Sequence, residues 1–432
     1  MAITHTIEIG KKKSKRKTWK EFTPEEKGAY FEQKRAKMAE AKIAFVNKII
    51  EYAESKEHFP WEEPNFVRSP KSMSKLEDLE KYNAKHPDNP KPRSEANYKG
   101  MNTLILCQAM DASGYKDSRW MTFNQIIKFD QAAKAAYKEE MKKDPDKEPL
   151  QGPLVHLKET DRIGTQIFVV NPEGKIRKVV NPKTHKVEVV YKRNKETGEF
   201  LLDENGKKIP EKDPTWNTKT VYNVEQVEGL HLAPEPPMKA LDTKEKCPEM
   251  ETIIAHSEAK VIHDQYGGDG RYYSPMEDKI HLPPVEQFKS MSSYYATAAH
   301  EIGHSTGHPN RLNREMGGPF GSASYAREEL VAELTSVFLS QELDIKIPQK
   351  EMTNHAEYIR SWDTKVNVLK ENPKELIKVI SDAQKATEYI KEHMLERYRD
   401  KEQNKEKQVE AKKEKPKAKG LKRKVSSKSL ER

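Results

Sequence analysis

One short stretch of the sequence concentrates side chains that bind metals. At 299–308 the chain reads "AHEIGHSTGH", which holds three histidines and one glutamate. Residues four apart lie almost above one another on a helix, so His300 and His304 could direct two imidazoles at one ion. Two histidines at this spacing are typical of zinc sites, and the pattern predicts Zn2+ as the cofactor.

Zinc held by two histidines needs a third protein ligand. His308 follows Gly307, where the helix is expected to end, so it is a weaker candidate. The stretch "REELVAEL" offers carboxylates, because Glu329 and Glu333 are four residues apart and share a helix face. We predict that Glu329 binds the metal and that Glu333 orients a ligand imidazole from behind, with Glu328 as the alternative ligand. The competing interpretation is that these acids only stabilise the first turn of a helix.

Glu301 lies next to the first histidine and has no ligand role in this pattern. A carboxylate in that position can take a proton from a water molecule that a metal has acidified, which is general-base catalysis. We therefore predict Glu301 as the catalytic residue of a zinc metallopeptidase site. The alternative is a structural zinc site, which needs no such base. Strand candidates around Tyr272 and Ile280 could offer an edge to an extended peptide.

The elements that must position these side chains can be predicted from the period of the apolar residues. We expect a helix at "EMETIIAHSEA", strands at "RYYSP" and "DKIHLPP", and a helix from about 285 through "YYATAAHEIGHSTG". A loop and the helix "SYAREELVAELTSVFLSQEL" follow, with one or two amphipathic helices between 353 and 398. Both segments with predicted ligands are thus expected on helices.

The first half of the chain combines helices with strands. Residues 24–58 carry apolar side chains at helical spacing, which predicts a helix that ends before Pro60. The pattern at 68–96 indicates a surface segment with one short helix. The stretch "NTLILCQAM" predicts a buried helix. From 153 to 228 the period changes to two, and "NPEG", "NPKT", "ETGE" and "ENGKK" separate the strands, which predicts an antiparallel meander. A proline-rich stretch at 230–245 marks the predicted domain boundary.

The positive charge of the chain is concentrated at its two ends. The whole chain carries +9, whereas residues 1–20 carry +6 and residues 401–432 carry +8, so residues 21–400 carry −5. The lysine-rich composition of both ends predicts disordered arms that can contact polyanions. Net charge alone therefore does not make the folded part a nucleic-acid binder.

Cysteine usage and hydropathy indicate the compartment. The two cysteines, Cys107 and Cys247, are 140 residues apart, which argues against a disulfide framework and favours a reducing environment. The N-terminus lacks the apolar core of a secretory signal, and no apolar run reaches the roughly 20 residues that span a bilayer. These features predict a soluble, cytoplasmic protein with no membrane partner.

Several segments together resemble a known family. "YYSPMEDKIHLPPVEQF", "YYATAAHEIGHSTGHPNRLNR", "FGSASYAREELVAELTSVFL" and "NHAEYIRSW" resemble the zincin-like metallopeptidase half of the antirestriction protein ArdC family. Toward the N-terminus, "FPWEEPNF", "NYKGMNTLIL", "SRWMTFNQ" and "VYNVEQVEG" resemble its single-stranded DNA-binding domain. The resemblance runs from about residue 36 to 395 and keeps the family's order of motifs. The segments 68–93 and 171–215 are longer in this sequence than is usual in the family.

The resemblance implies an α+β protein of a phage or another mobile genetic element, which helps incoming DNA escape restriction in the host cytoplasm. It implies a single-stranded DNA-binding domain joined to a gluzincin-type metal site. The family pattern carries over to His300, Glu301 and His304. It extends to Glu329 as the third ligand. Binding of single-stranded DNA requires aromatic and basic residues. Together with this requirement, the resemblance favours four residues as the DNA-binding face: Tyr98, Lys99, Arg119 and Trp120.

The expected organisation has five segments. They are a basic disordered arm at 1–24, an ArdC-like single-stranded DNA-binding domain at 25–232, a linker at 233–245, a zincin-like metallopeptidase domain at 246–398 and a lysine-rich disordered tail at 399–432. The expected function is an antirestriction protein that binds single-stranded DNA and carries a zinc metallopeptidase-like site, with a host protein or peptide as the candidate substrate. The alternative is a DNA-binding protection protein whose zinc site is structural.

Overall fold

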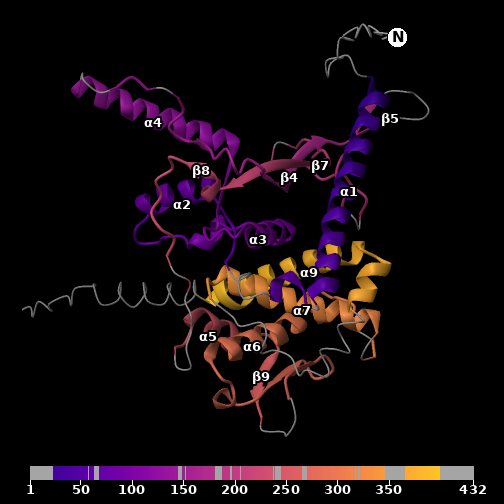
Figure 1. Ribbon diagram of the computed structural model, residues 1–432. Helices are drawn as coiled ribbons and strands as arrows, with labels where there is room; N and C mark the ends of the chain where they lie inside the picture. Colours follow the sequence, from indigo (N-terminus) through magenta and orange to yellow (C-terminus); the bar gives the residue numbers. More distant parts are fainter. Residues whose placement is uncertain are drawn as a thin grey trace, which may run out of the picture.

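The computed structural model describes residues 23–398, except 57, 63–67, 145–147, 151, 181–186, 195–196, 205, 237, 239–244, 265–269, 317, 320–321 and 346–364. Both basic ends and the predicted helix at "HAEYIRSW" lie outside the described residues. The described chain is a mixed α+β protein in which an N-terminal half with helices and sheet is stacked on a helix-rich C-terminal half (Figure 1). Within this part of the chain, no helix is long and apolar enough to cross a bilayer.

The N-terminal half follows the predicted change from helix to strand. Its elements are α1 (Pro24–Lys56), β1 (Lys71–Ser72), α2 (Met73–Lys85), α3 (Met101–Ser113), β2 (Arg119–Thr122), α4 (Phe123–Lys143), β3 (His156–Leu157), β4 (Thr165–Ile176), β5 (Lys178–Val180), β6 (Val187–Val189), β7 (Lys212–Asn223) and β8 (Val227–Glu228). The helices predicted at 24–58 and over "NTLILCQAM" are confirmed as α1 and α3. α1 ends before Pro60, whose ring cannot continue a helix.

The segment at 68–96 is more deeply integrated than predicted. Its helix α2 is 13 residues long and buries Met73, Leu76 and Leu79. These residues recur at three-residue steps and therefore form one apolar face. Met73 and Leu76 join a buried cluster with Met121 of β2 and Ile126 of α4, so α2 belongs to the core of the N-terminal half.

The main sheet has four strands in the order β1-β2-β7-β4. β1 runs parallel to β2, and the other neighbours are antiparallel. The predicted antiparallel pairing is confirmed, but the simple meander is wrong. The long strands β4 and β7 pair with each other, while β5 and β6 form a separate two-stranded sheet between them in sequence. "NPEG" does not reverse the chain, because it is absorbed as a bulge between Asn171 and Lys175 within β4.

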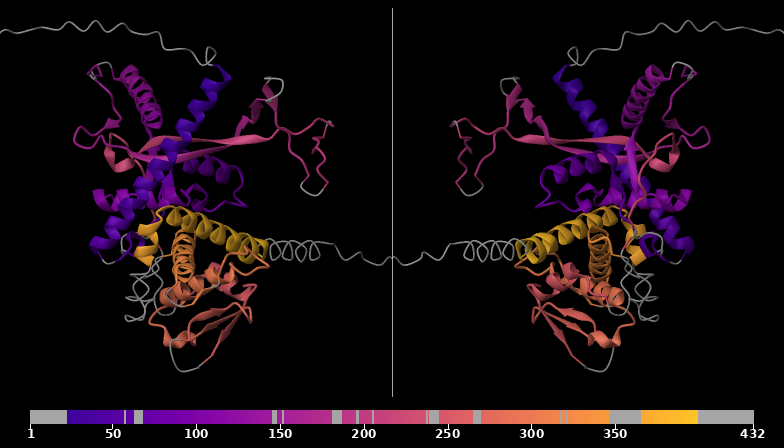
Figure 2. Two further views of the ribbon diagram at one scale, coloured as in Figure 1. Left: turned by 90° about the vertical axis from the view of Figure 1, so that its right-hand side faces the viewer. Right: turned by 90° about the vertical axis from the view of Figure 1, so that its left-hand side faces the viewer.

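Helix α3 covers one face of this sheet. Leu106 and Met110 of α3 pack against Trp120, Ile167 and Val221 of the strands. Because side chains alternate along a strand, the neighbouring residues of β4 and β7 point to the opposite face. Figure 2 shows the β4–β7 pair above α3, with that opposite face directed away from the helix.

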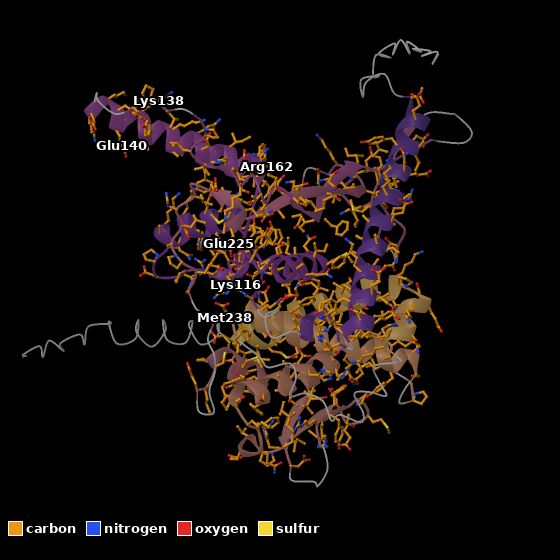
Figure 3. All side chains as sticks on the ribbon, viewed as in Figure 1. Lys116, Lys138, Glu140, Arg162, Glu225 and Met238 are labelled. Carbon is orange, nitrogen blue, oxygen red and sulfur yellow. The ribbon has the colours of Figure 1, made fainter. Side chains whose placement is uncertain are left out.

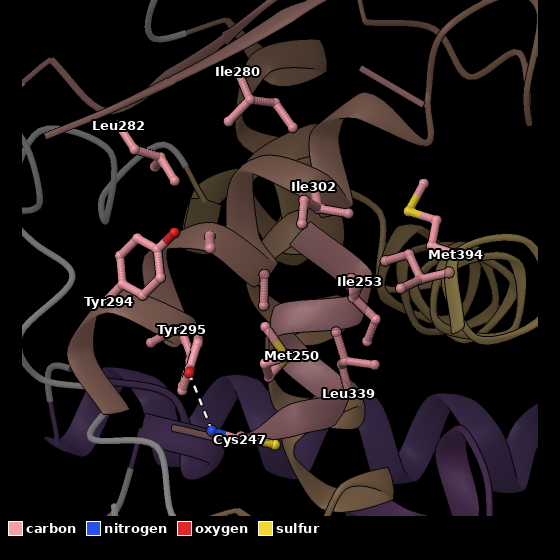
Figure 4. Close-up of a cluster of buried hydrophobic side chains, with 14 of the residues drawn as sticks. Cys247, Met250, Ile253, Ile280, Leu282, Tyr294, Tyr295, Ile302, Leu339 and Met394 are labelled. Atoms are coloured by element: carbon pink, nitrogen blue, oxygen red, sulfur yellow. Dashed lines mark hydrogen bonds between the residues drawn. The ribbon is translucent and has the colours of Figure 1, made fainter. Parts of the chain in front are cut away.

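The C-terminal half packs helices against one side of a small sheet. Its elements are α5 (Pro248–Ala255), β9 (Lys260–His263), β10 (Tyr272–Ser274), β11 (Lys279–Leu282), α6 (Met291–Ser305), α7 (Ala323–Glu342), α9 (Lys374–Ile390) and a π-helical turn (Lys391–Glu396). The predicted strands and helices from α5 to α7 are confirmed, but α6 begins at Met291, later than the predicted 285, because the Ser290 side chain caps it. The sheet order is β10-β11-β9, and Figure 4 shows the buried cluster that joins this sheet to α5 and α6.

Helices α6 and α7 approach each other closely at Gly303. A Cβ atom at this position would lie 3.2 Å from Thr335 Cβ and 3.3 Å from Ala332 Cα. Glycine therefore allows a helix contact that a larger residue would push apart. Across the same interface, the Ser336 hydroxyl donates to the Ala296 carbonyl at 3.2 Å. This close packing brings the first turns of α7 beside the histidines of α6.

One hydrophobic core joins the two halves. Its residues from the N-terminal half are Val46, Ile49, Ile50, Ala53, Phe59, Trp61, Leu104 and Cys107, and its residues from the C-terminal half are Leu330, Val331, Leu334, Val337, Phe338, Val366, Leu369, Leu376, Val379, Ile380 and Ala383. α1 packs on α9 at this junction, as Figure 1 shows. The core therefore crosses the boundary predicted at 230–245.

Candidate metal centre

Two imidazoles lie edge to face on α6, with ring centroids 4.7 Å apart. His300 and His304 are one helical turn apart, and their Nε2 atoms lie 3.1 Å from each other. Their side chains are 15% and 12% exposed, on a helix that is otherwise almost wholly buried. The two ring nitrogens that could bind a metal are thus directed to one point.

The carboxylate of Glu329 on α7 completes a cluster of three possible ligands. Its oxygens lie 3.6 Å from His300 Nε2 and 3.5 Å from His304 Nε2. Ligands roughly 2.0–2.1 Å from a tetrahedral zinc ion stand roughly 3.3–3.4 Å apart, close to the separations found here. One ligand atom from each residue lies within 4.8 Å of the others. The three residues therefore fit a tetrahedral divalent metal, and they are the three possible ligands found within the part of the chain that the structure describes.

Glu328 holds the second imidazole from behind. One oxygen of Glu328 lies 3.3 Å from His304 Nδ1, on the side of the ring opposite the possible metal ligand. The guanidinium of Arg314 donates to both oxygens of Glu328, at 2.6 Å and 3.0 Å. A carboxylate behind a ligand histidine fixes its tautomer and its orientation. Glu328 is therefore placed as a partner of a ligand, and the alternative that it binds the metal itself is not favoured.

The prediction that Glu333 orients an imidazole is corrected. Its carboxylate accepts a hydrogen bond from the Trp61 indole at 2.8 Å and one from the Lys365 ammonium at 2.9 Å. Glu329 and Glu333 do lie one turn apart on α7, as predicted. However, α7 crosses α6, so one turn along α7 leads away from the histidines and toward the N-terminal half.

Glu301 is buried beside the cluster and is only 6% exposed. Burial raises the pKa of this carboxyl, and the nearby imidazoles of His300 and His304 only partly offset that effect. The backbone of Tyr273, in β10, lies near enough to the Glu301 carboxylate to lower its pKa slightly. The described geometry therefore places an acid next to the possible ligands without including it among them.

The possible ligands attract one another electrostatically. Burial alone would lower the pKa of His304, but the carboxylates of Glu328 and Glu329 raise it to about 10. Burial alone would raise the pKa of Glu329, but hydrogen bonds with His300 and His304 hold it well below its usual range. A metal ligand must be deprotonated. A cation bound between His300, His304 and Glu329 would therefore take the place of the proton on His304.

Two arginines after α6 hold the end of the helix, and the sequence analysis did not identify them. Arg311 donates to the Ser305 carbonyl at 2.6 Å, and Arg314 donates to the Gly303 carbonyl at 2.9 Å. The last carbonyls of a helix have no partner within the helix, and cations are favoured at this end. Arg314 therefore fixes both the helix end and Glu328. The available signal was "NRLNR", which puts two arginines directly after the predicted helix.

Strand β10 forms one edge of the small sheet, next to the cluster. β11 pairs with it on one side, and no other described strand pairs on its outer side. The Tyr273 backbone lies near Glu301, so this strand borders the candidate site. Tyr272 is 50% exposed and stacks on His281 with ring centroids 4.6 Å apart. An edge strand in this position can pair with an extended peptide.

The four predicted DNA contacts do not form one exposed face. Trp120 is fully buried beneath α3, so it cannot present its ring to a base. Arg119 is 8% exposed, binds Asp117 and donates to the Ala233 carbonyl at 3.0 Å. Tyr98 is half-buried against the same cluster as Trp120, and Lys99 is exposed but lies 3.2 Å from Glu388. The predictions for Trp120 and Arg119 are therefore corrected, because the strand β2 that carries them lies inside the sheet.

Comparison with protein families matches two regions of the chain. Residues 39–222 match the N-terminal domain of anti-restriction factor ArdC. Residues 248–382 match a zincin-like metallopeptidase domain. The second match contains His300, Glu301, His304 and Glu329.

Curated relatives share parts of this sequence. Two DNA primase TraC proteins of Escherichia coli are each 32% identical to it, over 304 and 305 residues. Those regions are 69% of this chain but only 23% and 17% of the two TraC proteins, so the chain spans less than a quarter of their length. An uncharacterized protein of Sinorhizobium fredii, y4eC, is 33% identical over 171 residues, which are 40% of this chain and 52% of that protein.

A solved structure shares the fold of this chain. The metal-free crystal structure of the antirestriction ArdC protein from plasmid R388 matches 82% of this chain and 97% of its own, with a TM-score of 0.51 and 21% identity. The Mn(II)-bound crystal structure of the same protein matches with a TM-score of 0.49 and 22% identity. The first of these likenesses shows a common architecture across both halves of the chain.

Proposed function

We propose that this chain, which belongs to the ArdC family, is an antirestriction protein that binds single-stranded DNA and uses a metal centre to hydrolyse peptide bonds. The observation that carries the catalytic part is the arrangement of four residues on two crossing helices. His300, His304 and Glu329 converge on one point. Glu301 is buried beside them and is not one of the three possible ligands.

The ligand set supports a divalent metal of borderline softness, with zinc as our first choice. Two imidazoles and one carboxylate also suit other first-row ions, so the identity of the metal must be measured. When bound, such an ion polarises a carbonyl oxygen and lowers the pKa of a water molecule. The chain itself holds the ligands, through Glu328 behind His304 and Arg314 behind Glu328.

In this proposal Glu301 holds and transfers the proton of the attacking water. Its position supports the role, because it lies next to His300 in sequence and against the backbone of β10 in space. A peptide paired with the edge of β10 would bring its carbonyl carbon near this carboxylate. The chain thereby orients an extended substrate with its own backbone, and Glu301 returns the proton to the leaving amine.

A second candidate function is a protection protein whose metal is structural. The low exposure of the site favours this alternative, because Glu301 is 6% exposed and the possible ligands are 12% to 21% exposed. Structural zinc sites are closed, whereas catalytic sites keep an open position. However, a purely structural site has no use for a buried acid beside its ligands.

The test is the Glu301→Gln variant of the full chain, because glutamine keeps the shape but cannot accept the proton. We expect the variant to keep its metal and its single-stranded DNA binding, and to lose protection of unmodified DNA entering a restricting host. The readouts are metal content, oligonucleotide binding and transfer efficiency into restricting and non-restricting hosts. If the variant protects as well as the parent chain, the metal is structural and hydrolysis is not the mechanism.

Point substitutions are the appropriate test, because the halves cannot be separated safely. Removing either half would expose the core that α1 and α3 share with α7 and α9. Loss of activity after truncation would then report misfolding. The origin of the chain in a phage or another mobile element, and its location in the host cytoplasm, belong to the same proposal and rest on the family.

A further inference from the structure

We infer that a single strand of nucleic acid binds across the open face of β4 and β7, where its bases stack on aromatic side chains. The inference rests on the proposed DNA binding and adds a location for the strand. We call this surface the β4–β7 face. It consists of Gln166, Phe168, Thr218, Thr220 and Tyr222 on the strands, with Phe123 and Ile127 of α4 beside them.

The β4–β7 face is the side of the sheet that α3 does not cover. Gln166 pairs with Thr220, and Phe168 pairs with Thr218, so these side chains share one face. The alternate residues, such as Ile167, point to α3. Gln166, Thr218 and Thr220 are exposed. In Figures 1 and 2, α4 and α1 diverge on this side of the sheet and flank the β4–β7 pair.

Aromatic rings mark two positions along this face. The Tyr222 and Phe123 ring centroids are 6.4 Å apart, with the planes inclined by 56°, and Phe123 is 51% exposed. Gly164 lets the chain pass beside Tyr222, because a Cβ there would lie 2.8 Å from the ring. The second position is Phe168. It pairs with Thr218, which is four residues before Tyr222 on β7, so Phe168 lies about 13 Å along the sheet from Tyr222. Aromatic faces spaced along an open sheet can stack successive bases of a strand.

The charge of the face complements a polyanion. In the stretches 123–129 and 162–169 beside the face, both charged residues are basic, namely Lys128 and Arg162, whereas Lys219 of β7 pairs with Ile167 and points to the α3 side of the sheet. Residues 21–400 as a whole carry −5, so this surface differs from the rest of the folded part. The ammonium of Lys42 on α1 lies 5.6 Å from the Phe168 ring centroid, and Figure 3 shows Arg162 between α4 and the sheet. Binding of single-stranded nucleic acid requires cations for the phosphates and aromatic rings for the bases.

Other occupants fit the face less well. A peptide added as a strand along β4 would compete with Asn102, which donates to the Phe168 carbonyl at 2.7 Å and accepts from its N–H at 2.8 Å. A partner protein or a second copy would need a larger apolar surface. The large exposed apolar side chains here are Phe123, Ile127 and Ile163, and they adjoin hydroxyl and amide groups.

The experiment compares ring-keeping and ring-removing variants at the same positions. We would measure fluorescence anisotropy of a labelled 20-nucleotide single-stranded DNA of mixed sequence with the full chain at 150 mM salt. Stacking on one aromatic residue contributes a factor of roughly five to one hundred and fifty. We expect Phe123→Leu and Tyr222→Leu each to weaken binding at least about fivefold, whereas Phe123→Tyr and Tyr222→Phe stay within about twofold. Lys42→Gln should reduce the slope of log affinity against log salt by about one unit, because the Lys42 ammonium lies beside the Phe168 ring of the face.

The outcomes separate this inference from the proposed function. If the parent chain binds the strand and all four ring variants bind equally well, the inference is overturned while DNA binding stands. If the parent chain does not bind, the DNA part of the proposed function fails together with the inference. If the leucine variants instead abolish self-association in sedimentation and leave DNA affinity unchanged, the face is an interface between copies and the inference is again overturned. Metal content and thermal unfolding of each variant exclude loss of fold as the cause.

Discussion

The Trp61 indole donates a hydrogen bond of 2.8 Å to Glu333, one turn along α7 from Glu329. Trp61 belongs to the N-terminal half and is 1% exposed, stacked on Phe59. The same carboxylate accepts from Lys365 at 2.9 Å. The helix that carries the predicted third metal ligand is therefore held in place by a residue of the other half of the protein.

Trp61→Phe tests this link. The substitution keeps an aromatic ring but leaves a mostly buried carboxylate with one partner fewer, which we expect to lower the free energy of unfolding by about 1–3 kcal/mol. Thermal and denaturant unfolding measure the change. In a double-mutant cycle with Glu333→Gln, the two effects should be clearly non-additive. Simple additivity would mean that the hydrogen bond contributes nothing to holding α7.

Glu329→Gln and Glu333→Gln discriminate between the two acids that share one face of α7. We expect Glu329→Gln to reduce bound metal from about one ion per chain to a small fraction, because an amide is a poor substitute for a carboxylate ligand. Glu333→Gln should keep its metal, because its contacts are Trp61 and Lys365. Elemental analysis after dialysis against zinc and manganese measures both. Retention of metal by Glu329→Gln would remove it from the ligand set.

Arg314→Gln tests the support behind His304. Without the guanidinium, Glu328 loses its two shortest hydrogen bonds and no longer orients the imidazole. We expect metal affinity to fall by about 10–100-fold, the usual effect of losing such support. Competition with a chromophoric chelator measures the affinity. Arg327→Gln is the matched control, because Arg327 lies one residue before Glu328 but binds Glu375. The metal affinity of this variant should stay within about twofold of that of the parent chain.

Gly303→Ala tests the crossing of α6 and α7. The added Cβ would stand 3.2–3.3 Å from Thr335 and Ala332, so the helices must move apart. We expect a loss of about 1–3 kcal/mol in the free energy of unfolding and weaker metal binding, because the ligands come from both helices. Gly152→Ala is the control, since a Cβ there meets nothing within 4 Å. Equal stability of the two variants would show that the crossing tolerates a wider spacing.

Removing residues 1–20 and 401–432 tests the basic ends. They carry +6 and +8, and phosphate contacts by such segments release counterions. We expect the truncated chain to show a flatter dependence of DNA affinity on salt, measured by titrating the same oligonucleotide at several salt concentrations. An unchanged slope would exclude the ends from DNA binding. Substitutions on the β4–β7 face should act independently of this truncation.

Local patterns predicted the elements around the metal centre well. The apolar spacing and the small residues of "SYYATAAHEIGHS" indicated a buried helix, and "SYAREELVAEL" indicated the helix that supplies Glu329. These patterns are local, because helix periodicity and capping depend on residues only a few positions apart. The strands between 153 and 228 were predicted in type, but β1, β2 and the order of the strands were not, because pairing depends on residues far apart in sequence.

Which acid lies behind His304 could not be predicted from spacing. Glu328 and Glu333 both lie near Glu329 in sequence, and only the crossing of α6 and α7 at Gly303 decides which one faces the imidazole. The DNA contacts failed for a related reason. Trp120 is an aromatic residue, the type expected to stack on a base. However, β2 is an interior strand of the sheet, and α3 covers the face to which this ring points.

The sequence by itself determined the chemistry that is available: two histidines one turn apart, an acid between them, and carboxylates on a later helix. It also determined the family, because the motifs and their order are written in the chain. The tertiary structure decided which carboxylate meets which imidazole, which aromatic rings reach the surface, and that both halves share one core. The physical reason is that these outcomes depend on how helices and strands cross, and those contacts join residues that are distant along the chain.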